Sequence, residues 1–338
     1  MKRRLFVATP LLLTGALSCD QWRLLTGAPG SRGPCVARVA GTAFGTVISL
    51  CALGAESGQL HNALRRAMRE VQRIDALMSL YRPDSQLSVL NRTGALDGAD
   101  PHLLKNLRFA AELSELTDGA FDVTVQPLWE LFDQARKIHG DGALPGADAI
   151  ARARQLVDYR AVRVEDDRIR LERPGTKITL NSLAQGYAVD VVLQILRREA
   201  VQAALVDTGE IGNLGRRAPT EPWTLGVQHP RNRTGLSALI AMDGRVVSTS
   251  GDYATTFTSD YRYHHIFDPA TGVSPVGYAS TIVLASTGLL ADGLSTALMV
   301  MDRSDGDALL RHYPGSDALW IDKQARLDAT AGVPLVQA

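Results

Sequence analysis

Asp292 and Thr296 lie four residues apart in an apolar run that predicts a helix over 289–301. Side chains at that spacing share one face of a helix. A carboxylate and a hydroxyl on one face suit a hard cation such as Mg²⁺, which takes few protein ligands beside water and phosphate oxygens. Spacing alone favours a plainer interpretation, a capped helix start, so both interpretations stay open at this point.

A second polar segment opens the helix predicted over 183–198. Asn181 or Ser182 would cap this helix. The backbone N–H groups of a first helical turn have no partner within the helix, so they favour anionic ligands. Gly186 in that turn costs about 1 kcal/mol relative to alanine. We therefore expect a ligand or another segment of the chain to lie close to Gly186.

Further polar residues interrupt apolar runs elsewhere in the sequence. Tyr81 could stack on a planar ring, and Asp122 and Thr124 are polar residues in an otherwise apolar run. His264 and His265 are adjacent, and neighbours on a strand point to opposite faces, so they make a poor metal pair. One of them could contact a substrate. Each segment taken alone also fits a helix end, a cap or a turn.

The order of these segments resembles that of the ApbE family, the FAD:protein FMN transferases. The matching motifs are MSxYxxxSxLSxxN at 78–91, GAFDxTVxPL at 119–128, AxGYAVD at 184–190, SGDY at 250–253, HxxDPxTG at 265–272 and ADxxxTA at 291–297. The resemblance runs from about Gly41 to Met301. Six ordered matches are not expected by accident, whereas each motif alone is a weak signal.

The resemblance implies an enzyme. Members of this family bind FAD with Mg²⁺, cleave its pyrophosphate, and pass the FMN half to a Ser or Thr hydroxyl of an acceptor flavoprotein, with release of AMP. Some members instead hydrolyse FAD to FMN and AMP. Two alternatives to the transferase therefore stay open, an FAD pyrophosphatase and a flavin-binding protein without catalysis.

The resemblance also implies which residues form the site. It places the metal ligands on the backbone carbonyl of Ala184 and the side chains of Asp292 and Thr296. The implied contacts to the flavin and the nucleotide fall on Met78, Tyr81, Asp122, Thr124, Gln185, Gly251, Asp252 and His265. Asp292 or Asp252 could take the proton of the acceptor hydroxyl, and His265 is the third catalytic candidate.

The sequence departs from the family pattern around the predicted phosphate contacts. Many members have Gly-Gly before the alanine and Lys after it, where this chain has Asn181, Ser182 and Gln185. The later Gly-Gly-Asp-Ile appears as Gly209-Glu210-Ile211, with Glu210 in place of the Asp. This wording is similar to the NosX-like branch, which flavinylates the regulatory membrane flavoprotein of nitrous oxide respiration. That regulator or a respiratory flavoprotein subunit is the expected acceptor.

The first 36 residues predict export. A charged start at 2–4 and a short apolar stretch form a signal peptide over 1–18, too short to span a bilayer. The order Arg-Arg-Leu-Phe fits a twin-arginine signal. Cys19 follows the predicted cleavage site and is a candidate lipid anchor. We expect a tether over 19–36, a catalytic domain over 37–338 and a periplasmic location.

Composition excludes several classes of protein. The chain has 338 residues, with 36 Lys+Arg against 36 Asp+Glu, and 45% of its residues are hydrophobic. That apolar content and zero net charge exclude disorder, and the lack of a basic excess argues against a nucleic-acid partner. Three cysteines allow one disulfide, whose pair the sequence does not choose, and they form no zinc motif.

Hydrophobic periodicity predicts mixed helices and short strands. The expected helices cover 60–78, 101–119, 147–158, 183–198 and 289–301. The expected strands cover 43–52, 161–165, 168–172, 177–181, 203–207, 223–228, 236–241, 244–249 and 280–286, followed by a closing helix and hairpin. Helices and strands do not alternate strictly, which favours an α+β domain with mixed or antiparallel sheets. The resemblance implies a T-fold-related ApbE-like domain.

Overall fold

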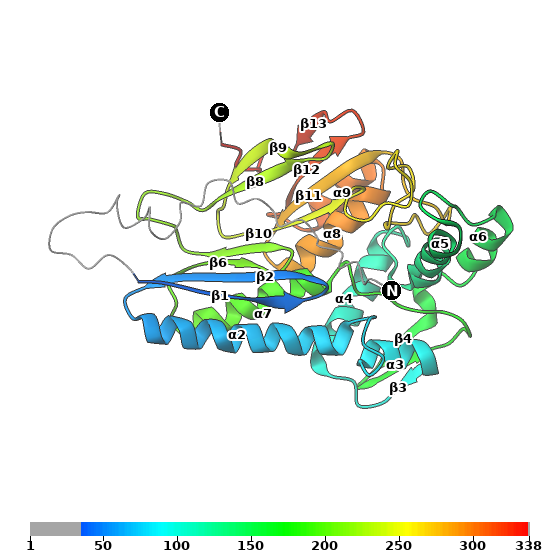
Figure 1. Cartoon of the computed structure of the whole chain (residues 1–338), viewed down its shortest axis with the longest axis horizontal. Coiled ribbons are helices and arrows are strands. Elements are labelled where there is room, and N and C mark those ends of the chain that lie inside the picture. Colours follow the sequence, from blue (N-terminus) through cyan, green and yellow to red (C-terminus); the bar gives the residue numbers. More distant parts are fainter. Residues whose placement is uncertain (1–34, 337–338) are drawn as a thin grey trace.

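The structure is a computed structural model that describes residues 35–336 (Figure 1). The predicted signal peptide, Cys19 and nearly all of the predicted tether lie outside the described residues. The first strand begins at Cys35, so the last two residues assigned to the tether belong to the folded domain. No helix within 35–336 is long and apolar enough to cross a membrane.

An antiparallel eight-stranded sheet organises the described part of the chain. Its strands in spatial order are β1 (Cys35–Ala43), β2 (Thr46–Gly54), β6 (Ala203–Asp207), β7 (Ile211–Leu214), β10 (Val246–Gly251), β11 (Tyr278–Ala285), β12 (Asp317–Asp322) and β13 (Leu327–Ala329). At its middle, β7 and β10 share one residue pair, Ile211 with Val247. The predicted α+β class with antiparallel sheets is confirmed.

Helices cover one face of this sheet. They are α2 (Ser57–Met78), α7 (Ala184–Arg198), α8 (Gly288–Val300) and α9 (Arg303–His312), while α4 (Pro101–Leu116) packs against α2 and α8. Figure 1 shows α2 and α7 beneath β1, β2 and β6, and α8 beneath β10 and β11. The apolar side chains that recur every three or four residues along α2 are all buried, as the periodicity predicted.

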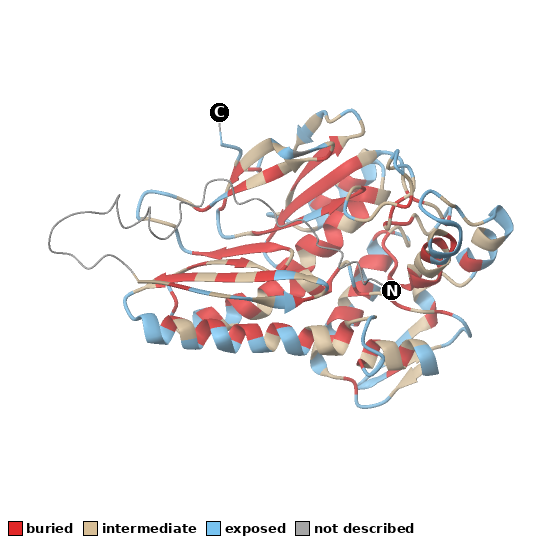
Figure 2. Cartoon of the chain, in the orientation of Figure 1, coloured by how far each residue is buried: buried red, intermediate tan, exposed pale blue. Residues whose placement is uncertain are grey.

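A two-stranded hairpin packs on the opposite face of the sheet. It consists of β8 (Thr224–His229) and β9 (Asn232–Ala241). Trp223 and Ile240 from this hairpin region form a second core with Ile282 and Ile321 of the sheet. Figure 2 shows the central strands buried and the outer side of α2 exposed. The sheet is therefore covered on both faces, which explains its apolar runs.

The remaining elements lie at one end of the sheet. They are α3 (Gln86–Thr93), β3 (Ala95–Leu96), α5 (Gln126–His139), α6 (Ala147–Arg154), β4 (Val162–Glu165) and β5 (Arg168–Leu171), with single 3₁₀ turns at Val123–Val125 and Tyr159–Ala161. Phe132 of α5 packs against Phe257 and Phe267 of a later loop. This aromatic cluster attaches α5 to the loop that carries the two adjacent histidines.

Some predicted elements are wrong or missing. Residues 177–181 form no strand, because Ile178 N donates to the Asn91 side chain and Thr179 N to the Val123 carbonyl instead of to a ladder. The histidine pair lies in a loop with one isolated bridge, Thr256 to His264, and not in a strand. The sequence pattern did not predict β1, α3, α5 and β7.

The one disulfide that the sequence allows does not form between the two cysteines that the structure describes. Cys35 pairs across the sheet with Gly54, whereas Cys51 pairs with Arg38, three residues further along β1. Side chains three residues apart on a strand point to opposite faces. Cys35 and Cys51 therefore cannot meet without a change in strand register, and no disulfide joins them.

Candidate active site

The helices that carry the predicted metal ligands cross near the first turns of α7 and α8. Ala184 is the first residue of α7, and Asp292 and Thr296 lie on α8. A Cβ on Gly186 would stand 2.1 Å from the carbonyl oxygen of Gly288. Only a glycine fits this crossing, so a packing contact explains the predicted cost of Gly186.

Two carboxylates, one on each helix, accept hydrogen bonds from the first turn of the other helix. Gly186 N donates to Asp292 Oδ2 at 3.0 Å. Asp190 of α7 in turn accepts from Gly288 N at 2.6 Å and from Leu289 N at 2.9 Å, at the start of α8. Each helix thus receives an N-terminal partner from the other. The prediction that Asn181 or Ser182 caps α7 is wrong: Leu183 occupies that position without a side-chain cap.

Hydroxyl groups of β10 and α8 surround Asp292. Ser250 Oγ lies 3.2 Å from Thr296 Oγ1 and 2.8 Å from Ser295 Oγ. Ser248 Oγ approaches Asp292 Oδ1 at 3.5 Å, a long contact that leaves this carboxylate oxygen weakly bonded. The site is therefore rich in oxygen atoms.

Glu210 is a second buried carboxylate beside Asp292. Its Oε2 accepts from Thr249 N at 3.0 Å, and its residue is 7% exposed. Burial raises the pKa of Asp292 to about 7. Burial and the charge of Asp292 together raise the pKa of Glu210 well above its usual range. Among the side chains that the structure describes, no lysine or arginine forms an ion pair with either carboxylate.

This donor set fits a hard cation better than a soft one. The described residues contain no group of three or more His, Cys, Asp or Glu side chains placed to hold a metal. Asp292, the hydroxyl of Thr296 and the Ala184 carbonyl would leave most positions to water or phosphate. Mg²⁺ keeps several such non-protein ligands, whereas zinc sites use nitrogen and sulfur.

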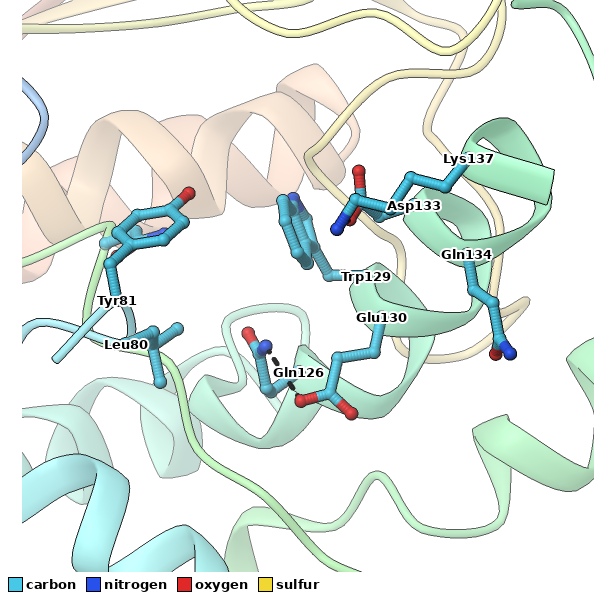
Figure 3. A pocket seen from close by; sticks show the side chains of 9 residues that line it. Leu80, Tyr81, Gln126, Trp129, Glu130, Asp133, Gln134 and Lys137 are labelled. Carbon is cyan, nitrogen blue, oxygen red and sulfur yellow. Dashed lines mark hydrogen bonds and ion pairs between the residues drawn. The ribbon is translucent and has the colours of Figure 1, made fainter. Parts of the chain in front are cut away.

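A pocket of about 310 Å³ opens beside the end of α2. Its walls consist of Leu80, Tyr81, Gln126, Trp129, Glu130, Asp133, Gln134, Lys137 and Asn181. Figure 3 shows the rings of Tyr81 and Trp129 on opposite sides of the opening, with Gln126 bonded to Glu130 at the base. Tyr81 is 75% exposed, so its ring is free to cover a planar ligand.

The other residues predicted to contact the cofactor differ in what their side chains do. Met78 is buried in the main core at the end of α2. Asp122 Oδ1 accepts from both N and Oγ1 of Thr124, and its Oδ2 accepts from Tyr159 N. Burial raises the pKa of Asp122 to about 6. Asp122 and Thr124 thus shape the turn before α5. The amide of Gln185 lies against Gly209.

Asp252 is committed to two cations. Its carboxylate accepts from both terminal nitrogens of Arg231 at 2.8 and 2.7 Å and from Lys323 Nζ at 2.8 Å. Gly251, the preceding residue, ends β10. Both carboxylate oxygens are occupied by these cations, so this geometry favours a positioning role for Asp252.

The two adjacent histidines have different environments. His264 is fully buried, and its Nε2 donates to the Pro275 carbonyl at 3.2 Å. Burial lowers the pKa of His264 to about 3. His265 is half-buried, and its Nδ1 donates to the Thr255 carbonyl at 3.1 Å, which leaves Nε2 as an acceptor. Burial also lowers the pKa of His265, so its imidazole is neutral at pH 7.

Several residues of the site were not predicted from the sequence. Asp190 ends one quoted motif and Trp129 directly follows another, but neither received a role. Arg231 and Lys323 carry no sequence signal, because each lies in a turn far along the chain from Asp252. Only the topology of the sheet brings these cations together.

The chain is similar to known proteins over most of its length. The model of the ApbE family matches residues 44–320. The FAD:protein FMN transferase of Treponema pallidum is 31% identical, covering 94% of this chain and 95% of the relative. That of Vibrio cholerae is 31% identical over 75% of this chain and 77% of the relative. The solved ApbE protein of Thermotoga maritima superposes with a TM-score of 0.77 at 27% identity, over 88% of this chain and 97% of that one. The solved flavin transferase ApbE of Vibrio cholerae superposes with a TM-score of 0.76 at 28% identity, over 88% of this chain and 98% of that one.

Proposed function

The chain belongs to the ApbE family, and on that premise we infer that it transfers FMN from FAD to a hydroxyl of an acceptor flavoprotein. The observation that supports this most directly is the crossing of α7 and α8, where Gly186 N, two residues after Ala184, donates to Asp292 Oδ2 at 3.0 Å. Ala184, Asp292 and Thr296 are the positions that the family resemblance assigns to the metal. The chemistry would be phosphoryl transfer.

We propose Mg²⁺ as the metal, held by the Ala184 carbonyl, Asp292 and Thr296. Bound there, Mg²⁺ would neutralise the charge of the FAD pyrophosphate. The buried carboxylates that lack a cationic partner support this proposal, since an unpaired buried charge is costly. Glu210 would hold the Thr249 backbone against the site through its accepted hydrogen bond.

The transfer exchanges the phosphoanhydride bond of the FAD pyrophosphate for a phosphoester bond to the acceptor. The acceptor's Ser or Thr oxygen forms a bond to the phosphorus of the FMN half. The bond from that phosphorus to the bridging oxygen breaks, and AMP leaves with the electron pair. We propose that His265 Nε2 takes the proton of the hydroxyl, because its Nδ1 is already a donor and its imidazole is neutral.

The pocket between Tyr81 and Trp129 is the proposed site for a ring of FAD. Both rings face the opening, and Gln126 and Asn181 supply polar groups at its wall. An aromatic wall with a few polar groups is typical of sites for planar ligands. Leu80 adds apolar surface beside Tyr81.

We propose that the protein works after export, with 1–18 as its signal peptide, 19–36 mainly as a tether and Cys19 as a candidate lipid anchor. Its acceptor would then be a periplasmic or membrane-bound FMN protein. A regulator of nitrous oxide reductase or a respiratory flavoprotein subunit fits the NosX-like wording of the sequence.

One experiment tests the transferase. The protein, FAD and Mg²⁺ are incubated with a candidate acceptor domain, and the denatured acceptor is examined for flavin fluorescence in a gel. We expect covalent fluorescence with the wild-type protein and none with Asp292→Ala. AMP release that needs no acceptor, without a fluorescent acceptor, would identify a pyrophosphatase instead.

A further inference from the structure

Arg231 and Lys323 approach one buried carboxylate from two different turns. Arg231 lies between β8 and β9, Lys323 between β12 and β13, and Asp252 directly after β10. The three contacts measure 2.7 to 2.8 Å. Asp252 is fully buried, whereas the two cationic side chains are 25% and 22% exposed.

The charges in this cluster do not balance. One cation is enough to neutralise Asp252, so the pair leaves an excess of one positive charge at the edge of solvent. Lys323 has three N–H donors and Asp252 takes one of them. Arg231 stacks on the Tyr261 ring at 4.2 Å, which holds its guanidinium in one plane. Fixed cations with unused donors are suited to an anion.

The cluster borders the candidate active site. Ser250, two residues before Asp252, contacts Thr296 on α8. The Asp252 carboxylate also lies close enough to His265 to oppose the lowering of its pKa by burial. The cations are therefore next to the proposed metal ligands and the proposed base.

The helix start nearest to the metal ligands offers no cation of its own. The first turn of α7, Ala-Gln-Gly-Tyr-Ala, contains no lysine or arginine. Gln185 is neutral, its amide lies against Gly209, and its carbonyl accepts from Thr208 Oγ1 at 2.8 Å. Any side-chain cation that binds the phosphates beside the proposed Mg²⁺ must therefore come from elsewhere in the site.

We propose that Arg231 and Lys323 bind a phosphate group of FAD and that Asp252 is a positioning residue that holds both cations in place. This rests on the proposed function. The other interpretation is that the cations only neutralise Asp252 and fasten two turns to the end of β10. The two interpretations predict different effects on ligand binding. Only if the cations bind phosphate does their contribution to affinity depend on the number of phosphates in the ligand.

The test compares ligands that differ in phosphate number. Binding of riboflavin, FMN and FAD with Mg²⁺ is measured by quenching of flavin fluorescence, for the wild-type protein, Arg231→Gln and Lys323→Gln. We expect each variant to bind FAD about tenfold more weakly, with riboflavin affinity unchanged, because charge-assisted hydrogen bonds to phosphate are lost. The loss should shrink in high salt.

Arg245→Gln is the matched control. Arg245 also joins two carboxylates, Asp243 at 2.7 Å and Asp317 at 2.6 Å, but it precedes the opposite end of β10. We expect Arg245→Gln to lower thermal stability without weakening FAD binding. Melting curves for all variants show which proteins are folded. If Arg231→Gln is unfolded, Lys323→Gln, which removes only one contact, tests whether the cations bind phosphate.

The outcomes separate the two proposals. A wild-type protein that binds no FAD contradicts the proposed function itself. Wild-type binding with equal FAD affinity in Lys323→Gln overturns only the phosphate assignment. An equal loss for riboflavin and FAD also overturns it, since that indicates a distorted site. Unchanged FAD affinity with a raised KM for the acceptor would assign the cations to an acidic acceptor group instead.

Discussion

The backbone N–H of Gly186 donates to Asp292 Oδ2 at 3.0 Å across the crossing of α7 and α8. This single contact joins two motifs that lie 106 residues apart in the chain. It fixes the carboxylate of the proposed metal ligand relative to the start of α7, where Ala184 lies. The bond also leaves Oδ1 as the oxygen available to a cation, since its one contact is long.

Replacing Gly186 with alanine should separate the two helices. The new Cβ would stand 2.1 Å from the Gly288 carbonyl oxygen and 2.6 Å from Asp292 Cβ. Overpacking of this kind costs about 1–3 kcal/mol, and here the nearest atom is backbone, so we expect the upper end. Thermal melting measures the loss. Gly58→Ala on α2, where nothing lies within 4 Å, should leave stability equal or raise it.

Magnesium should stabilise the protein in a pH-dependent way. Burial raises the pKa of Asp292 to about 7, above its unfolded value of 3.8. The metal-free fold therefore keeps this proton between those two pH values and loses stability as pH rises through that window. Mg²⁺ binds the ionised carboxylate and competes with the proton, so the increase in melting temperature on adding Mg²⁺ should be larger at pH 8 than at pH 6.

Asp292→Ala supplies the comparison for this metal effect. The variant should show no Mg²⁺-dependent change in melting temperature at any pH. Asp302→Ala, at the start of α9, removes a carboxylate that makes no side-chain cap and should keep the full Mg²⁺ effect. A Mg²⁺ effect that survives in Asp292→Ala would move the metal to another site.

The sequence predicted those elements whose signals are local. Asp100 and Pro101 open α4 as the cap and first residue that their types indicate. The missed helix α5 begins with Gln126 and Pro127 inside a motif that was interpreted only as polar residues in an apolar run. Its buried face packs on Phe257 and Phe267, whose positions no local pattern reveals.

The same distinction between local signals and contacts distant in sequence applies to the candidate site. The four-residue spacing of Asp292 and Thr296 indicated one helix face, and the structure places both on α8. The pairing of Glu210 with Asp292 could not be predicted, because it depends on β7 lying beside β10, a contact made by a single residue pair. The predicted cap of α7 was wrong for a similar reason. The backbone N–H of Gly186 in its first turn donates to Asp292 on another helix.

The exposed ring of Tyr81 should matter for ligand binding and not for stability. At 75% exposure it contributes little to the core, so Tyr81→Ala should leave the melting temperature within about 1 °C. Loss of one stacking partner should weaken FAD binding by about 0.5–1.5 kcal/mol, measured by flavin fluorescence. Ile138→Ala, which removes an exposed apolar side chain from α5, should alter neither quantity. Equal FAD affinity in Tyr81→Ala would place the flavin elsewhere.

The two adjacent histidines should separate stability from catalysis. His264 is buried with its pKa lowered to about 3, so the stability that it contributes is present above pH 6.5 and is lost as pH falls from 6.5 towards 3. His264→Asn should cost about 1–3 kcal/mol of folding stability, because buried polar partners lose their bonds.

His265→Asn should keep the melting temperature but lower the rate of FMN transfer by about 10²–10⁴-fold, the usual contribution of a general base. Because burial lowers the pKa of His265, the acid limb of the wild-type pH–rate profile should lie below pH 6.5. A His265→Asn variant that keeps both the wild-type rate and this acid limb would assign the proton to another group.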